Sequence, residues 1–298
     1  MKDKFISDYI KMISQHSSLI IQEGNKSWTN VDFSKTEPEI IREYLLTPGK
    51  GVDYLNQKIS TIISSQTRFE IKFASVYCHQ KPRVKRTTNS LLKCKGSTPS
   101  CELGDLMTIF VLLDRNKKIV YSTAKIMQAK RKNILDSESQ KCLYESDLEF
   151  EMPQNIVNQS TNSNIIRTLP NYNNKRSDGL SYLILNDGSP KNKEIPSASN
   201  LIYDWSFHLE LMMEFKTGLP FVPPNNPQEN DWNCIINDLL NVGTGKVKSQ
   251  TVRSGFGLDY FVNAFNDYDY FPEFYLDNND FGIPKLIILC KDTELKSQ

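Results

Sequence analysis

The sequence predicts an α/β (α+β) fold in which helices flank a central β-sheet. Two apolar runs, Leu106–Leu113 and residues 119–127, are separated by a short polar segment, as in a hairpin buried within a sheet. Residues 69–78 alternate between apolar and polar side chains like a further strand, and amphipathic helical patterns precede them. These three observations indicate one sheet with helices packed against it.

The N-terminal region, residues 1–68, is predicted to be helical and to pack on the core. Residues 1–21 form an amphipathic helix with interspersed charges, unlike a signal peptide. Thr36 and Glu39 form a capping box for a helix that runs to about residue 46. A second amphipathic helix is expected over residues 52–65, before the first strand.

The hairpin is expected to bring three polar residues to one end of the sheet. With a two- or four-residue turn, Leu113 pairs with Lys118, and the pairing continues back to Asp105. Because side chains repeat every two residues along a strand, Gln128 and Lys130 then lie on the face of Asp105. A three-residue loop would reverse that parity.

These groups suit the hydrolysis of a phosphodiester. The Asp105 carboxylate, the Gln128 side-chain carbonyl and the Ala129 backbone carbonyl are oxygen ligands, which Mg²⁺ (or Mn²⁺) prefers. Such a cation neutralises developing charge and activates water. Lys130 would stabilise the pentavalent phosphate or position the attacking water. The alternative is that Asp105 is a solvated residue at a strand end and that the aliphatic part of the Lys130 side chain packs on apolar surface.

Asp105 followed by Gln128-x-Lys130 resembles the PD-(D/E)xK nuclease superfamily, in the branch where Gln replaces the middle acid, as in Mrr-type restriction enzymes. In the helix expected next, Gln140-x3-Tyr144 resembles the Gln-x3-Tyr motif of RecB-like nucleases, with both side chains on one helix face. The alternative there is a capping box of Ser137 with Gln140 and core packing by Tyr144. The resemblance covers roughly residues 69–150.

The resemblance implies a restriction-endonuclease-like αβββαβ core with a mixed sheet, and a metal-dependent nuclease that acts on DNA, with RNA as the alternative substrate. It also implies a homodimer and a role in bacterial restriction or anti-phage defence. Gln128 leaves the site one negative charge short, so a compensating acid is expected from Glu102 or from an upstream helix. Glu39 and Glu43 could offer that carboxylate, and the alternative is that they form the exposed face of their helix. The alternative function is a nuclease-fold protein that has lost metal affinity and binds nucleic acid or acts as an assembly partner.

Basic residues surround the predicted site in the sequence and would contact phosphates at its edge, unless they form a solvated loop. They are Lys81, Arg83, Lys85, Arg86, Lys93, Lys95, Lys125, Arg131 and Lys132. His79 is either a base or phosphate contact, or a structural residue at a strand end. The predicted nucleic-acid contacts are His79, Lys81, Arg83, Arg131, Gln140 and Tyr144.

Composition bounds the remaining expectations. With 24% charged residues and a net charge of +1, no global field attracts nucleic acid, so affinity must come from local patches. The mean hydropathy is −0.47 and no apolar run reaches 18 residues, so we expect no membrane span and a cytoplasmic protein.

The six cysteines show no pairwise C-x2-C spacing and are expected to be reduced in the cytoplasm. A zinc site built from Cys78, His79, Cys94 and Cys101 is the alternative, and it is disfavoured because adjacent Cys and His make awkward ligands.

The remaining chain divides into two expected parts. Residues 69–190 would form the nuclease-like core, with a polar loop at 154–180 and a fourth strand at 181–186. Residues 191–298 would form a mixed helical extension. It holds helices at about 205–216 and 232–240 and a strand at 285–290.

Overall fold

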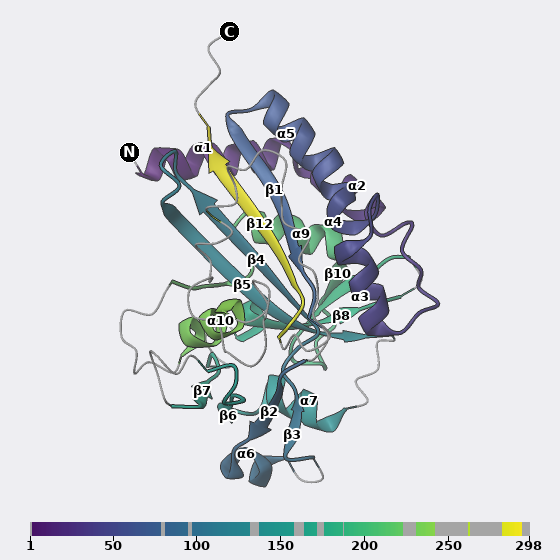
Figure 1. The fold of residues 1–298 in the computed structure, drawn as a ribbon, viewed down its shortest axis with the longest axis vertical. Helices are drawn as coiled ribbons and strands as arrows, with labels where there is room; N and C mark the ends of the chain where they lie inside the picture. The colour runs from purple at the N-terminus through teal and green to yellow at the C-terminus, as the bar shows by residue number, and fades with distance from the viewer. Residues whose placement is uncertain are drawn as a thin grey trace.

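A mixed sheet runs through the centre of the molecule (Figure 1). The computed structural model describes residues 2–78, 81–94, 97–131, 137–157, 164–171, 176–186, 188–222, 231–241, 262 and 282–293. Within these residues the sheet has eight strands in the order β1-β12-β4-β5-β8-β9-β10, with β11 paired to β5. Its strands are β1 (Phe69–Val76), β4 (Leu106–Leu113), β5 (Ile119–Lys130), β8 (Leu180–Ile184), β9 (Lys191–Glu194), β10 (Ile202–Asp204), β11 (Leu219–Pro220) and β12 (Lys285–Asp292). The predicted mixed α/β class is confirmed.

Strand β12 is an interior strand of this sheet, next to the edge strand β1. It pairs antiparallel with β1 and parallel with β4, so the first two strands expected for the core are not neighbours. All its side chains except that of Lys291 are buried, as the apolar run predicts for a strand covered on both faces. Residues beyond 190 therefore supply part of the central sheet as well as helices.

The β4–β5 hairpin has a different register from the one expected. Leu113 pairs with Ile119 rather than with Lys118, and the register shifts by one residue between Leu112 and Leu113. The Asp114 carboxylate causes the tight turn, because it accepts hydrogen bonds from the backbone N–H groups of Asn116 and Lys118 at 2.9 and 2.8 Å. The turn and the bulge each shift the pairing by one residue, two in all, so the predicted side-chain parity is preserved.

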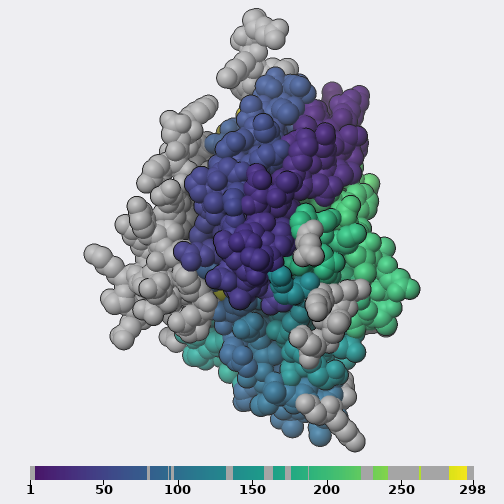
Figure 2. Space-filling view, turned by 90° about the vertical axis from the view of Figure 1, so that its right-hand side faces the viewer, coloured from purple at the N-terminus to yellow at the C-terminus, as the bar shows by residue number. Residues whose placement is uncertain are grey.

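One face of the sheet is covered by the N-terminal helices and by α9 (Trp205–Met213). These are α1 (Lys2–Gln15), α2 (Ser17–Lys26), α3 (Glu37–Leu46), α4 (Gly51–Leu55), the π-helical turn η1 (Asn56–Ser60) and α5 (Thr61–Gln66). Figure 2 shows them in purple and blue as a continuous layer. The Thr36–Glu39 capping box is present, whereas the single helix expected over residues 1–21 is broken at His16.

The other face is covered by α7 (Glu138–Glu145), by α10 (Trp232–Asn241) and by a second sheet with the strand order β3-β2-β6-β7. Its strands are β2 (Arg83–Arg86), β3 (Ser100–Glu102), β6 (Glu149–Glu151) and β7 (Ile166–Thr168), near the short helix α6 (Thr88–Lys93). The basic segment after Pro82 is therefore a strand rather than a loop. The loop expected at 154–180 holds β7 and α8 (Arg176–Gly179) in its described parts. No helix in the described ranges has the length and apolarity to cross a bilayer.

Candidate active site

Asp105, Gln128 and Lys130 lie on one face of the sheet, at one end of the hairpin. Leu106 pairs with Met127, so extending the register by one residue places Asp105 opposite Gln128. The alternate side chains of β4 and β5 confirm the parity. Those of Met107, Ile109, Ala124 and Ile126 join the core under α7 and α10, whereas those of Leu106, Met127 and Ala129 join the core under the N-terminal helices.

Asp105 is 5% exposed and both of its carboxylate oxygens have partners. Oδ2 accepts a hydrogen bond from the backbone N–H of Ala129 at 2.7 Å, and Oδ1 forms an ion pair with the Lys81 ammonium. Glu102 Oε2 lies 3.8 Å from the same ammonium. Burial alone would lower the pKa of Lys81, but the two carboxylates outweigh it and raise that pKa above its ordinary value.

Gln128 is fully buried and its amide is only half satisfied. Its Nε2 donates a hydrogen bond to the Glu102 carbonyl at 2.8 Å. Among the described residues no group donates to its Oε1, which is also buried. An unpaired buried carbonyl costs about 1–3 kcal/mol, so this oxygen is suited to receive a cation or a donor from a ligand.

Helix α7 supports Lys130. The Ser137 hydroxyl caps this helix by accepting a hydrogen bond from Gln140 N–H, and the Gln140 side chain accepts one from Lys130 Nζ at 2.8 Å. Tyr144 is buried, donates to the Leu103 carbonyl at 2.9 Å and stacks on Tyr182. Burial raises its pKa well above the ordinary value. Tyr144 thus forms part of the packed floor beneath the site, which favours the packing role over phosphate contact.

The acids expected from the upstream helix are engaged elsewhere. Glu39 accepts hydrogen bonds from the backbone N–H and the hydroxyl of Thr36, and Glu43 forms ion pairs with Lys35 and Lys50. Among the described acids that were expected to complete the site, Glu102 at the end of β3 approaches it, through the lysine that it shares with Asp105. The sequence placed Lys81 among the phosphate contacts, and only the fold shows that it pairs with Asp105.

The basic residues that were expected to contact phosphates differ in their burial. Arg86 is completely buried against Asp147, and Lys125 is buried against Glu194 on the opposite face of the sheet, so neither is a surface contact for phosphate as expected. The remaining predicted contacts are exposed or half-buried: Arg83 donates to the Ser100 carbonyl, Lys85 pairs with Glu151, and Arg131 donates to the Lys35 carbonyl and to Glu37. His79, Lys95, Lys132 and the Lys93 side chain lie outside the described residues.

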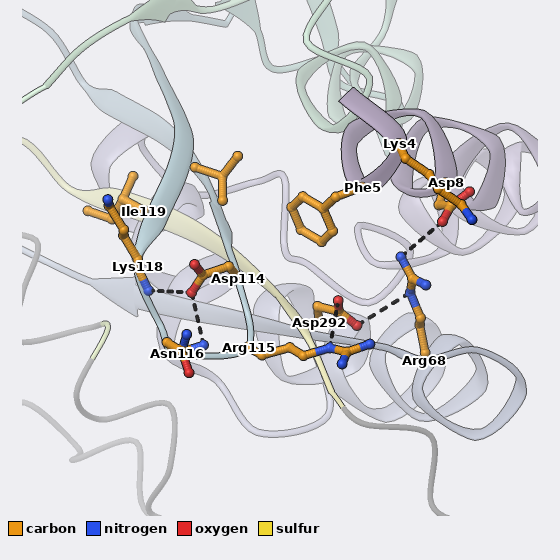
Figure 3. A pocket seen from close by; sticks show the side chains of 11 residues that line it. Lys4, Phe5, Asp8, Arg68, Asp114, Arg115, Asn116, Lys118, Ile119 and Asp292 are labelled. Atoms are coloured by element: carbon orange, nitrogen blue, oxygen red, sulfur yellow. Dashed lines mark hydrogen bonds and ion pairs between the residues drawn. The ribbon is translucent and has the colours of Figure 1, made fainter. Parts of the chain in front are cut away.

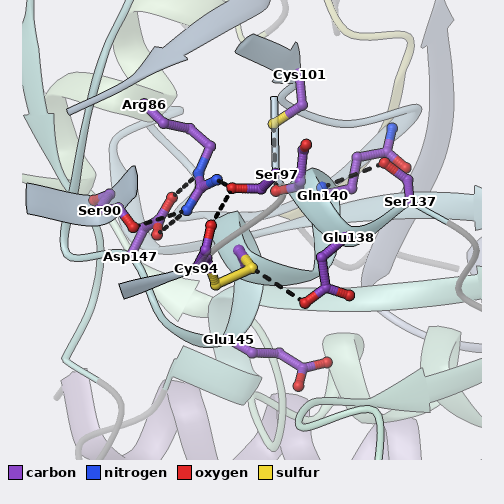
Figure 4. Close-up of a disulfide and its surroundings, with 12 residues drawn as sticks. Arg86, Ser90, Cys94, Ser97, Cys101, Ser137, Glu138, Gln140, Glu145 and Asp147 are labelled. Atoms are coloured by element: carbon purple, nitrogen blue, oxygen red, sulfur yellow. Dashed lines mark hydrogen bonds and ion pairs between the residues drawn. A yellow bond between two sulfur atoms is a disulfide. The ribbon is translucent and has the colours of Figure 1, made fainter. Parts of the chain in front are cut away.

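Cys94 and Cys142 form a disulfide, which contradicts the expectation that all six cysteines are reduced (Figure 4). It joins the end of α6 to α7, the helix that holds Lys130. The two cysteines are 48 positions apart, and the sequence gives no signal that they meet. Cys78, Cys101, Cys234 and Cys290 are buried and lie outside this disulfide. The alternative zinc site therefore loses one of its four ligands, because the sulfur of Cys94 is bonded to Cys142.

The oxygen donors of Asp105 and Gln128 match the ligand chemistry of Mg²⁺ or Mn²⁺, and the unpaired Gln128 Oε1 fits such an ion. Glu138 lies beside Cys94 and Cys142, but the disulfide occupies both sulfurs, and sulfur ligands do not suit Mg²⁺. Comparisons of this chain with protein-family models, with curated proteins and with solved structures found no match.

Proposed function

We propose that this chain is a metal-dependent nuclease that hydrolyses phosphodiester bonds in DNA. The observation that carries the proposal is the convergence of Asp105, Gln128 and Lys130 at one end of one sheet face. A carboxylate, an amide oxygen without a donor among the described residues and an oriented ammonium are the groups that phosphodiester hydrolysis needs.

The residues of the chain have distinct roles in this proposal. Asp105, Gln128 and the Ala129 carbonyl would hold Mg²⁺ or Mn²⁺, which supplies charge neutralisation and an activated water when bound. Gln140 fixes the Lys130 ammonium, which stabilises the additional negative charge on the phosphate in the transition state. Glu102 and Lys81 complete the charge balance around Asp105. The homodimer and the defence role implied by the resemblance belong to this proposal.

A supercoiled plasmid assay with Mg²⁺ or Mn²⁺, with and without EDTA, tests the proposal. We expect nicking that EDTA abolishes, and a loss of at least a hundredfold in Lys130→Ala and Asp105→Ala. Lys216→Ala is the matched control, because its side chain is 63% exposed and follows α9, which covers the opposite face of the sheet. Metal-dependent cleavage that survives both site substitutions would overturn the assignment of the site.

One observation favours a second function, that of a nucleic-acid-binding protein without catalysis. Both carboxylate oxygens of Asp105 are already engaged, one of them by the built-in cation Lys81. In this case the wild type would shift DNA in a gel without cutting it under any metal condition. The alternative role of assembly partner predicts neither cleavage nor a shift.

A further inference from the structure

Helix α7 supports the ammonium of Lys130 in the candidate active site. Gln140 in this helix accepts the 2.8 Å hydrogen bond from Lys130 Nζ. With eight residues, α7 is too short to be stable in water on its own, because isolated helices of fewer than about 12–15 residues are marginal. Its conformation therefore depends on the contacts that hold it against the rest of the protein.

Several hydrogen bonds join α7 to residues 98–103. The Ser139 hydroxyl accepts one from the backbone N–H of Thr98 at 2.7 Å, and the Cys101 thiol donates one to the Ser139 carbonyl at 3.7 Å. The Tyr144 hydroxyl donates to the Leu103 carbonyl at 2.9 Å. Each such bond contributes only about 0.5–1.5 kcal/mol to stability.

One contact of α7 is covalent. The Cys94–Cys142 disulfide joins the middle of this helix to the end of α6 (Figure 4). Cys142 lies two positions after Gln140, so the bond acts on the turn of helix that contacts Lys130. The chain between the two cysteines also carries all three residues of the candidate active site. The disulfide therefore fixes α7 relative to the segment that builds the site.

The two cysteines differ in their exposure. Cys94 is half-buried, whereas Cys142 is 2% exposed. Because thiol–disulfide exchange depends on access, a thiolate is expected to attack the Cys94 sulfur, with Cys142 as the leaving group. Glu138 Oε1 lies 3.6 Å from the Cys142 sulfur and can accept a hydrogen bond from the thiol that forms there. The disulfide itself has no S–H group to donate.

We propose that the Cys94–Cys142 disulfide is a redox switch on the candidate active site. The formed bond holds α7 and, through Gln140, the Lys130 ammonium, and its reduction releases them. The effect on catalysis rests on the proposed nuclease function, whereas the release of α7 does not.

The reductant in this proposal is a dithiol, of the thioredoxin type or dithiothreitol. One of its thiolates forms a mixed disulfide with Cys94 as the Cys94–Cys142 bond breaks, and Cys142 leaves and takes up a proton. The second thiol then attacks the mixed disulfide, which frees Cys94 as a thiol and closes the disulfide of the reductant. Two electrons and two protons pass to the cysteine pair in total.

Amide hydrogen exchange of the full chain, with and without dithiothreitol, tests the release of α7. We expect the amides of α7 to exchange faster by about tenfold or more in the reduced protein. The turn after β4 is the internal reference, where Asp114 binds the N–H groups of Asn116 and Lys118 beside a groove (Figure 3). The eight residues of β4, roughly 25 Å, separate this turn from Asp105, so its exchange should not change. Equal exchange of α7 in both redox states would overturn the switch.

The rate of plasmid nicking tests the effect on the site. The oxidised wild type should nick faster than the reduced protein by about tenfold or more, because misplaced catalytic groups lose rate steeply. Cys94→Ser/Cys142→Ser should match the reduced protein with or without reductant. Cys234→Ser, in α10 and outside the disulfide, is the matched control and should keep the redox response. Bridging the two reduced thiols with dibromobimane should restore the fast rate, because it ties α7 without a disulfide.

The two measurements separate the possible failures. Nicking that is equally fast in both redox states, with α7 released, would overturn the regulation of the site. No nicking in either state would overturn the proposed function, and the exchange of α7 would still decide whether the disulfide holds the helix. A circular dichroism melt of each variant verifies folding.

Discussion

Lys81 and Asp105, 24 positions apart in the sequence, form an ion pair at the start of β4 in which both side chains are at most 12% exposed. The ammonium of Lys81 therefore occupies the surroundings of the carboxylate that a divalent cation would need. Metal affinity and this ion pair are expected to compete at the same oxygen.

Lys81→Met should increase the affinity for Mn²⁺ about tenfold, because the competing charge is removed. Without metal the variant should melt at a lower temperature than the wild type, because Asp105 is left buried without its partner. Added Mn²⁺ should raise the melting temperature of the variant back towards that of the wild type. Calorimetric titration with Mn²⁺ and thermal melts measure both effects without any assay of activity. Lys85→Met is the control, and an unchanged Mn²⁺ affinity in Lys81→Met would contradict the competition.

Arg86→Met should lower the free energy of unfolding by about 3–5 kcal/mol, because it leaves the fully buried Asp147 carboxylate without its partner. Adding Asp147→Leu should recover part of the loss, since the unpaired charge is then gone. Urea denaturation measures both. Arg83→Met, on the same strand but exposed, should change stability by less than about 0.5 kcal/mol. An equal, small effect of both arginine variants would disprove the structural role of Arg86.

Reduction of the Cys94–Cys142 disulfide should destabilise the protein by about 4 kcal/mol, the chain-entropy value for closing a loop of 48 residues. Urea denaturation with and without dithiothreitol measures the difference. The double variant Cys94→Ser/Cys142→Ser should be as stable as the reduced wild type and should not respond to the reductant. A wild type that dithiothreitol leaves unchanged would contradict the expectation.

Stability should fall as the pH is lowered below about 6.5, in part because of His208. This ring is buried in α9 beside Trp205, and burial, followed by the nearby Lys125 charge, holds its pKa well below the ordinary value. As the pH falls, His208 is protonated in the unfolded chain at a higher pH than in the folded protein. The neutral, buried ring therefore makes its full contribution to the free energy of unfolding above the unfolded pKa, and this contribution is lost as the pH falls towards the folded pKa. The slope from this one group is at most about 1.4 kcal/mol per pH unit.

Denaturation in urea between pH 7 and 5 measures that slope, and His208→Gln should reduce it. His16→Gln, in the half-buried junction between α1 and α2, is the matched control. Equal slopes in the wild type and in His208→Gln would show that another group causes the acid sensitivity.

Local patterns predicted most of the regular elements. Thr36 and Glu39 gave the start of α3, and the apolar runs gave β4 and β5, because capping and burial depend on residues close in sequence. The shared face of Asp105, Gln128 and Lys130 was also predictable, since it depends only on the parity of a short turn. The pairing itself was wrong by two residues. One comes from the turn, where Leu113 pairs with Ile119, and the other from the bulge between Leu112 and Leu113, which nothing in the sequence indicates.

Long-range relationships were not predictable from local patterns. The Lys81–Asp105 pair, the Arg86–Asp147 pair and the disulfide each join residues that only the tertiary fold brings together. The number of basic residues in the sequence therefore overestimates the basic surface of the folded protein. Two of the expected phosphate contacts, Arg86 and Lys125, form ion pairs with buried acids.

The position of β12 has a consequence for synthesis on the ribosome. The strand fits between β1 and β4, yet it is made more than 170 residues after β4. While residues 114–284 emerge, the edges of β1 and β4 that will receive it have no native partner. The β4–β5 hairpin beside Asp105 therefore completes its sheet only after β12 has been synthesised. Until then the unpaired edges of β1 and β4 can pair with a strand of another chain.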